Sequence, residues 1–326
     1  MSFNASERSA GPELGAGASL TGKWHGRSYR VIRLIGSGAS GSVYLAQGDG
    51  GRVALKVADN PAALSLEYDR LRKFAQDDDG TDIGPRVHEL DDATFAGRPH
   101  YFLAMEYVEG IPIDAFIRER GAEWIPICLV RTARLLAMLH RHGYAFRDLK
   151  PANILIHRDT VSPRLVDFGG VTAVGQSVKE FTEAFDRAWW GRGSRRADAA
   201  YDLFACAMLG LQLFAPFARG EVERLSGVRP VERLEWLRGY CRRAGGAGRP
   251  GFAPVAAVLC GRTGDMEAFM QQLIGAVHRA AENRGRAPGR RRRRPRLGWD
   301  RTDYALLAAV LVFMSTLAAV VWFGNA

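Results

Sequence analysis

Cysteine is scarce in this chain of 326 residues, and its four cysteines lie far apart. Cys128, Cys206, Cys241 and Cys260 form no C-x-x-C pair, which argues against a zinc site or a redox-active pair. Two of them lie in apolar stretches, so we predict packed, reduced thiols. The cysteine content therefore excludes a small scaffold held together by disulfides.

A secretory signal and internal repeats are also missing. Residues 1–26 have no charged start followed by an apolar core, and their Gly, Ala and Ser content predicts a disordered leader. The absence of repeats excludes a repeat array. With 47% apolar residues, the chain can bury one full core. Helices are predicted at Pro126–His140, Asp202–Phe214, Val231–Arg243 and Met266–Glu282.

Two short motifs in the middle of the chain carry the strongest chemical signal. Residues 144–155 read Tyr-Ala-Phe-Arg-Asp-Leu-Lys-Pro-Ala-Asn-Ile-Leu, and an apolar run downstream ends in Asp-Phe-Gly at 167–169. This spacing predicts two ligand-bearing loops on one magnesium–nucleotide site. Asp148 would orient an attacking hydroxyl, and Lys150 would neutralise charge on the phosphoryl group that moves. Asn153 and Asp167 would hold the metal ions.

A glycine-rich segment lies upstream, where Gly36, Gly38, Gly41 and Val43 form the pattern G-x-G-x-x-G-x-V. Glycines let the backbone approach phosphates closely. A Rossmann turn is the alternative, but it requires a helix after the glycines and an acidic residue about 20 positions on. A strand-like run and an Asp-Gly-Gly turn follow instead, and then Lys56 interrupts an apolar strand. A lysine in such a strand is usually an edge or solvent-facing residue, but after this glycine-rich segment we predict that it reaches the α and β phosphates.

In this order the motifs resemble those of the bacterial eukaryotic-like (Hanks-type) Ser/Thr protein kinases. The resemblance implies an α+β, two-lobed protein-kinase fold over residues 27–283, with lobes at about 27–108 and 109–283. It implies ATP and Mg²⁺ (or Mn²⁺) as cofactors. It also implies transfer of the γ-phosphate to Ser or Thr of protein substrates.

The resemblance extends to the residues around the nucleotide. Lys56 would pair with Glu67 on the next helical run, although an i,i+3 pair of Glu67 with Arg70 is the alternative. In the run 101–110, the ending Met-Glu-Tyr-Val-Glu-Gly favours a hinge, whereas a plain core strand would explain only the apolar residues. The expected ATP-binding residues are Ile35, Gly36, Gly38, Gly41, Val43, Ala54, Lys56, Met105 as gatekeeper, Glu106, Val108 and Leu155.

The sequence departs from the family pattern at one position in the catalytic loop and in one longer segment. Phe146 replaces the usual His before Arg147, and we predict that its ring packs under Phe168 in a column with Leu71. Phe keeps the aromatic packing and loses one hydrogen bond, worth about 1 kcal/mol, so an active enzyme is expected.

The segment after Asp167 departs further, because it contains neither Gly-Thr-x-x-Tyr nor Ala-Pro-Glu. The chain rejoins the family pattern at Asp202, which would cap the backbone of the catalytic loop. Arg147 would be the cation against which a phosphorylated residue docks. The hydroxyls available for phosphorylation are Thr172, Ser177, Thr182 and Ser194, of which Thr182 is central and favoured.

The C-terminal end combines a basic stretch with an apolar one. Residues 284–303 hold nine arginines, including Arg290, Arg291, Arg292, Arg293 and Arg294, against Asp300 and Asp303. Their net charge of +7 accounts for most of the +10 of the chain. Residues 305–323 then carry no charge, and as a helix they would span about 28 Å, the thickness of a bilayer core.

We therefore predict a basic juxtamembrane linker at 284–303 and a transmembrane helix at 304–323. For residues 304–323, a helix buried in the protein core is the alternative. The arginines would fix topology and bind anionic lipid, or bind DNA phosphates, and both readings stay open.

The architecture resembles that of short, C-terminally membrane-anchored kinases of spore-forming bacteria, whose basic stretch binds DNA. This implies a single-pass cell-membrane protein with a cytoplasmic kinase domain. A kinase-like small-molecule phosphotransferase is the alternative function, and an inactive membrane or DNA-binding scaffold is a third.

Overall fold

The computed structural model describes residues 14–38, 41–74, 80–178, 182–245 and 249–286. By its contacts the chain divides into Met1–Ala281 and Glu282–Ala326, and the second unit is described only over 282–286. The predicted basic linker, including Arg290–Arg294, and the predicted membrane span thus lie outside the described residues. Within the described part, none of the helices combines the length and apolar character needed to cross a membrane.

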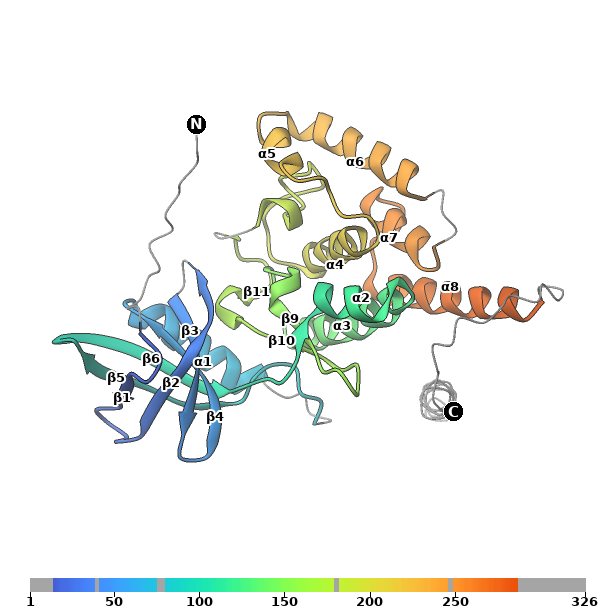
Figure 1. The fold of residues 1–326 in the computed structure, drawn as a ribbon. Helices are drawn as coiled ribbons and strands as arrows, with labels where there is room; N and C mark the ends of the chain where they lie inside the picture. The colour runs from blue at the N-terminus through green and yellow to red at the C-terminus, as the bar shows by residue number, and fades with distance from the viewer. Residues whose placement is uncertain (1–13, 39–40, 75–79, 179–181, 246–248, 287–326) are drawn as a thin grey trace, which may run out of the picture. The chain divides into compact units, whose positions relative to one another are not determined.

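The N-terminal lobe is built on one antiparallel sheet whose strands follow the spatial order β1-β2-β3-β4-β6-β5 (Figure 1). The Asp-Gly-Gly turn predicted from the sequence closes the hairpin in which Gly48 pairs with Gly51. One helix lies between the fourth and fifth strands and packs on the last two strands of the sheet. The elements are β1 (Ser19–Thr21), β2 (Ser28–Gly38), β3 (Gly41–Gly48), β4 (Gly51–Ala58), α1 (Pro61–Phe74), β5 (Val87–Phe95) and β6 (Arg98–Glu106).

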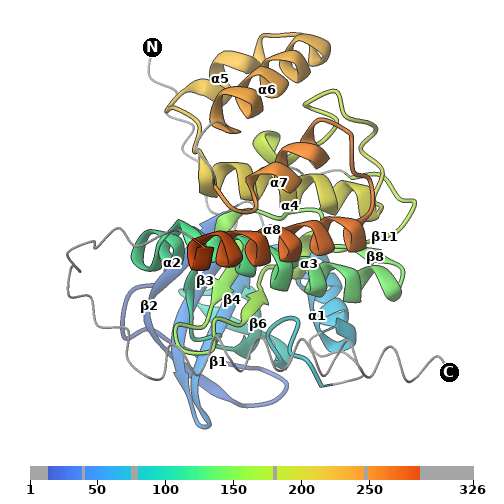
Figure 2. The ribbon, with the colours of Figure 1, turned by 90° about the vertical axis from the view of Figure 1, so that its right-hand side faces the viewer.

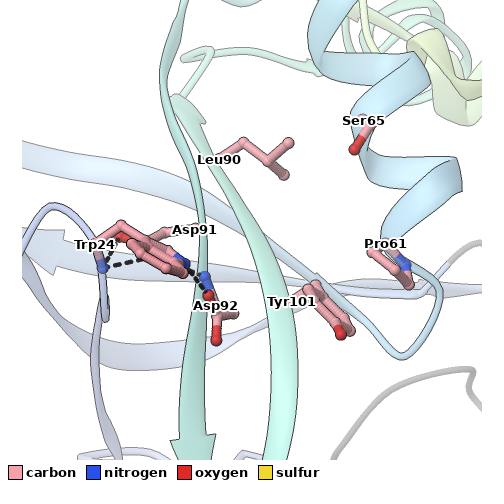
Figure 3. A pocket seen from close by; sticks show the side chains of 7 residues that line it. All are labelled: Trp24, Pro61, Ser65, Leu90, Asp91, Asp92 and Tyr101. Atoms are coloured by element: carbon pink, nitrogen blue, oxygen red, sulfur yellow. Dashed lines mark hydrogen bonds between the residues drawn. The ribbon is translucent and has the colours of Figure 1, made fainter.

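The predicted disordered leader is wrong for residues 14–26. Leu14 and Leu20 are buried in the core of the sheet, and Leu20 on β1 pairs with Tyr29 on β2. The Asp91 carboxylate then accepts the backbone N–H groups of Trp24 and His25, as Figure 3 shows for Trp24. Burial of two leucines and satisfaction of a buried carboxylate outweigh the flexible composition of this segment.

Leu20→Ala is expected to lower the free energy of unfolding by about 2–4 kcal/mol, because a fully buried leucine leaves a cavity when it is truncated. Ile32→Ala on the same sheet is the control, since Ile32 is 40% exposed and should cost less than about 1 kcal/mol. Urea denaturation followed by circular dichroism measures both. Equal losses for the two variants would contradict the burial of β1.

The C-terminal lobe is mainly helical, and its central helix α4 lies between α3 and α7 in both views (Figures 1 and 2). Every residue of α4 from Tyr201 to Leu211 is buried, so an apolar helix without a polar face is stable here. The helices are α2 (Ile113–Arg120), α3 (Ile125–Arg141), α4 (Ala199–Phe214), α5 (Glu221–Ser226), α6 (Pro230–Ala244), α7 (Phe252–Leu259) and α8 (Met266–Arg286). The four predicted helices are therefore confirmed, with no end shifted by more than four residues.

Short strands and 3-10 turns connect these helices and carry the site. They are β7 (Ile111–Pro112), η1 (Ala122–Trp124), β8 (Tyr144–Ala145), η2 (Pro151–Asn153), β9 (Ile154–Ile156), β10 (Pro163–Leu165), η3 (Phe168–Gly170), β11 (Thr172–Ala173) and η4 (Glu183–Phe185). All four cysteines are free, as predicted, and burial raises the pKa of Cys206 to about 12, so it stays a thiol.

Candidate active site

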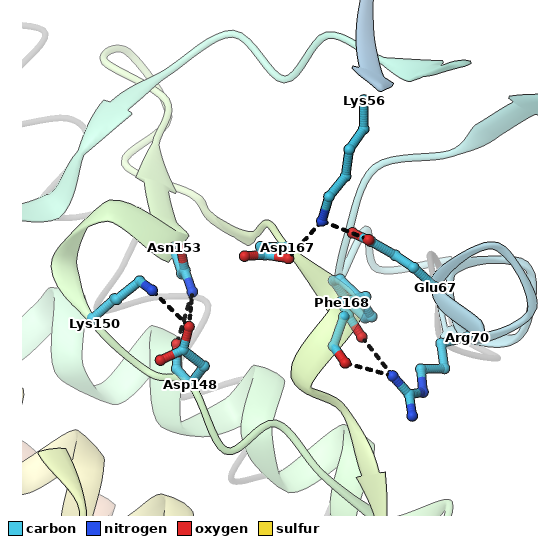
Figure 4. A network of polar contacts seen from close by, with 9 residues as sticks. Lys56, Glu67, Arg70, Asp148, Lys150, Asn153, Asp167 and Phe168 are labelled. Carbon is cyan, nitrogen blue, oxygen red and sulfur yellow. Dashed lines mark hydrogen bonds and ion pairs between the residues drawn. The ribbon is translucent and has the colours of Figure 1, made fainter. Parts of the chain in front are cut away.

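Lys56 is the centre of an ionic network that joins α1 of the N-terminal lobe to Asp167 of the C-terminal lobe (Figure 4). Its Nζ lies 2.6 Å from Glu67 Oε2 on α1 and 3.0 Å from Asp167 Oδ1. The expected pair between Lys56 and Glu67 is thus present. The alternative partner of Glu67, Arg70, instead donates to the backbone oxygens of Phe168 and Gly169.

The pKa values in this network favour the charged forms of the two groups at its centre. Burial would lower the pKa of Lys56, but the charges of Glu67 and Asp167 outweigh burial and raise it. Burial would raise the pKa of Asp167, but the attraction of Lys56 lowers it. For Glu67 burial dominates and raises its pKa, so of the two carboxylates Glu67 takes up a proton at a higher pH than Asp167.

Asp148 receives hydrogen bonds on its carboxylate from its own loop. Lys150 Nζ donates to Oδ2 at 2.7 Å, and Asn153 Nδ2 donates to Oδ2 at 3.1 Å and to the Asp148 backbone oxygen at 2.9 Å. Asp148, Lys150 and Asn153 converge because the 3-10 turn η2 folds the chain back on itself. The Lys150 charge also helps to lower the pKa of Asp167, so the two halves of the site interact.

A third donor to Asp148 comes from a distant segment, and no sequence motif predicts this contact. The Thr182 hydroxyl donates to Asp148 Oδ1 at 3.1 Å, across 34 residues of chain. Thr182 therefore helps to orient the Asp148 carboxylate from a part of the chain that lies outside its own loop.

Asp202 caps the catalytic loop, as predicted. Its carboxylate is fully buried and accepts the backbone N–H groups of Phe146 and Arg147, each at 2.8 Å. The sequence missed a further partner, His140 on α3, whose Nε2 lies 2.8 Å from Asp202 Oδ2. This clamp holds Arg147 at φ 71°, a left-handed conformation that is costly for a non-glycine residue.

Phe146 packs against Phe168, as the predicted column requires. The rings of Phe146 and Phe168 meet edge to face with centroids 5.7 Å apart, and both are fully buried in the main core with Leu71. A β-carbon at Gly84 would lie 2.4 Å from the Phe168 ring, so only glycine fits beside this column. Phe in place of His therefore keeps the packing intact.

The residues expected around the adenine come from five strands. Ile35 and Val43 lie on β2 and β3, Ala54 on β4, and Met105 at the end of β6. Leu155 lies on β9 of the other lobe. Strands of both lobes thus supply the apolar side chains that the resemblance assigns to adenine.

The hinge contains an ion pair that no sequence motif predicts. The Glu106 carboxylate accepts hydrogen bonds from Arg164 on β10, at 2.9 and 3.2 Å. Burial opposes ionisation of Glu106, but Arg164 outweighs burial and lowers its pKa. Val108, two residues on, is buried. Arg164 therefore ties the hinge to the C-terminal lobe.

The glycine-rich segment forms the end of the β2–β3 hairpin. Gly36 and Gly38 lie on β2, and Gly41 begins β3 with φ 123°. A β-carbon at Gly41 would lie 2.5 Å from the Val57 backbone oxygen, so this position requires glycine. Gly41 thus lies on β3, the strand that pairs with β4 and its Lys56, while Gly36 and Gly38 lie one strand further out on β2.

The side chains present fit a magnesium–nucleotide complex. Asn153 and Asp167 offer hard oxygen ligands, and the lowered pKa of Asp167 keeps it ionised. Lys56 supplies a buried cation for phosphate oxygens. A site with these groups is that of a nucleotide-dependent phosphotransferase.

Comparisons with known proteins agree with this class. Residues 29–218 match the protein kinase domain, and the chain belongs to the protein kinase family. It is similar to the serine/threonine-protein kinase YabT of Bacillus subtilis, with 39% identity over 198 residues, covering 60% of this chain and 58% of YabT. It is also similar to PknI of Mycobacterium tuberculosis, with 27% identity, covering 57% of this chain and 32% of PknI.

Two solved structures show the same fold. Vaccinia related kinase 3 aligns with a TM-score of 0.60 at 14% identity, covering 83% of this chain and 94% of that one. The Cydia pomonella granulovirus kinase PK-1 aligns with a TM-score of 0.57 at 16% identity, covering 75% and 93%. The matches span less than two thirds of YabT and of PknI. The α+β kinase fold predicted from the sequence is thus confirmed.

Proposed function

We propose that this protein is a Ser/Thr protein kinase that transfers the γ-phosphoryl group of ATP to a protein hydroxyl. The observation that carries the proposal is the Asp148 carboxylate, oriented by Lys150 and Asn153. Lys150 is also the residue that favours a protein acceptor over a small molecule. The similarity to YabT and PknI supports the same activity.

The chain's own groups suit each part of this reaction. The acceptor hydroxyl oxygen bonds to the γ-phosphorus, its proton passes to Asp148, and ADP departs with the electrons of the broken bond. Lys56, held by Glu67, compensates charge on the phosphates, and Lys150 does so on the moving group. Bound Mg²⁺ would supply further charge neutralisation, with Asn153 and Asp167 as its ligands.

Incubation of the purified full chain with labelled ATP and a mixture of protein acceptors tests the proposal. Label on Ser or Thr, in the chain itself or in an acceptor, is the expected result. Label that appears only on small molecules would indicate the alternative phosphotransferase, and no turnover of ATP would indicate an inactive scaffold.

Anchoring and DNA binding are further parts of the proposal. The uncharged run at 305–323 supports a single-pass membrane anchor, with the kinase domain on the cytoplasmic side where arginines are retained. The arginines at 284–296 support contacts with anionic lipid and with DNA phosphates. DNA bound there would stimulate the kinase.

Phosphorylation within the segment after Asp167 is the expected form of regulation. Ser177 and Ser194 are exposed, whereas the Thr172 hydroxyl is buried and donates to Gly170 at 3.0 Å. Thr182, favoured by its central position, has its hydroxyl on Asp148. A phosphate there would place a dianion against the base.

We expect at least one of these four hydroxyls to carry phosphate in the active protein, with Arg147 as the cation that a phosphate meets. Because of repulsion from Asp148, phosphate on Thr182 should lower activity, whereas phosphate on Ser177 or Ser194 should not. Mass spectrometry before and after incubation with ATP identifies the positions. Four unmodified hydroxyls in active protein would contradict this prediction.

A further inference from the structure

Asp186 is a fully buried carboxylate in the segment that lacks Ala-Pro-Glu. Its Oδ1 accepts the Tyr201 hydroxyl at 3.0 Å and the Ala188 N–H at 3.1 Å. Its Oδ2 accepts Arg195 Nε at 2.7 Å and the Trp189 N–H at 3.1 Å. A buried charge persists only when such donors replace water, and here four of them do.

The residues that follow Asp186 are fastened to the start of α4. Arg187 forms a two-pronged ion pair with Asp198, at 2.8 and 2.7 Å, and donates to the backbone oxygens of Ser194 and Arg196. Asp198 in turn caps α4 by accepting the Tyr201 N–H at 2.7 Å. The loop between η4 and α4 is therefore held by side chains rather than by regular structure.

These contacts close a ring that passes through the catalytic base. Thr182 contacts Asp148 and is joined to Asp186 by the single turn of η4. Asp186 accepts the Tyr201 hydroxyl. Asp202, the residue after Tyr201, accepts the backbone N–H groups of Phe146 and Arg147, directly before Asp148. A shift of Asp186 would thus be transmitted to the place where an acceptor hydroxyl meets Asp148.

We propose that Asp186, held by Tyr201 and Arg195, positions the acceptor hydroxyl by fixing Thr182 against Asp148, in place of the missing Ala-Pro-Glu closure. The proposal rests on the proposed protein kinase activity. Burial, together with the charge of Asp186, raises the pKa of Tyr201, so this hydroxyl stays a donor. Asp186 acts through other residues and is a positioning residue, not a catalytic one.

Tyr201→Phe in the full chain tests this role, because it removes one hydroxyl and keeps the ring. Tyr240→Phe is the matched control, since the Tyr240 hydroxyl donates to the backbone oxygens of Ala215 and Pro216 in the same lobe. Three quantities are measured for each variant: the KM for dephosphorylated casein, the KM for ATP, and ATP hydrolysis without acceptor. Asp186→Asn is the second variant, with thermal unfolding followed to show that it folds.

Tyr201→Phe is expected to raise the KM for casein roughly tenfold, the effect of a lost hydrogen bond to a charged group. The KM for ATP and the hydrolysis of ATP should change less than about twofold, and folded Asp186→Asn should show a larger rise in the casein KM. A Tyr201→Phe variant that behaves like Tyr240→Phe overturns the inference, as does a parallel loss of ATP hydrolysis. A wild-type chain that phosphorylates neither itself nor casein would instead refute the proposed function.

Discussion

Asp148→Asn is expected to lower phosphoryl transfer roughly 10²- to 10⁴-fold, because it removes the group that accepts the proton of the attacking hydroxyl. One carboxylate oxygen would become an NH2 group, which would then face either the donors on Lys150 and Asn153 at Oδ2 or the Thr182 hydroxyl at Oδ1. Asp159→Asn is the matched control, since Asp159 is exposed on the same lobe. Transfer of label from ATP measures both variants, and thermal unfolding checks the fold.

Lys56→Ala and Asp167→Asn should lower transfer by similar orders of magnitude. Lys56→Ala also leaves the buried Glu67 without its cation, so a loss of stability is expected with the loss of activity. Asp148→Asn is therefore the cleaner test. An Asp148→Asn variant that autophosphorylates at nearly the wild-type rate would show the kinase assignment to be wrong.

Replacement of Arg290–Arg294 by Gln is expected to abolish DNA binding and any stimulation of activity by DNA. Contacts with phosphate release counterions, so wild-type affinity should fall about 10³-fold or more between low and moderate salt, whatever the DNA sequence. Basal turnover of ATP should survive, because no catalytic motif lies beyond Asp202. Fluorescence anisotropy of labelled DNA with the full chain in detergent measures the binding.

A charge-matched control separates the linker from general basicity. Five exposed arginines of the kinase domain are replaced by Gln in the control, namely Arg86, Arg118, Arg158, Arg224 and Arg229. This control should keep its DNA affinity. If the wild type ignores DNA at low salt yet its linker binds anionic vesicles, the lipid explanation stands and the DNA explanation fails.

The sequence by itself determined the chemistry of the site. Asp148, Lys150 and Asn153 lie within one short loop, so their spacing already fixes which groups converge. The Lys56–Glu67 pair was also predictable, because a strand followed directly by a helix brings the two together. Phe146 could be assigned to packing, since its ring has the size that the column requires.

The composition of residues 14–26 gave the wrong expectation. Flexible residue types predicted disorder, but the outcome depended on Leu14 and Leu20, whose burial depends on a sheet formed by later residues. Local composition describes the entropy that a segment loses on folding, whereas the surface that it buries is set by its neighbours in space.

Only the tertiary structure decided how the segment that contains Thr182 and Asp186 is held next to Asp148. The contacts of Thr182 with Asp148 and of Asp186 with Tyr201 join segments whose separation in the chain follows no periodic pattern. The same holds for Arg164 and Glu106 at the hinge. A motif encodes groups that one loop or one turn brings together, but a hydrogen bond between distant segments exists only after helices and sheet have packed and fixed both partners.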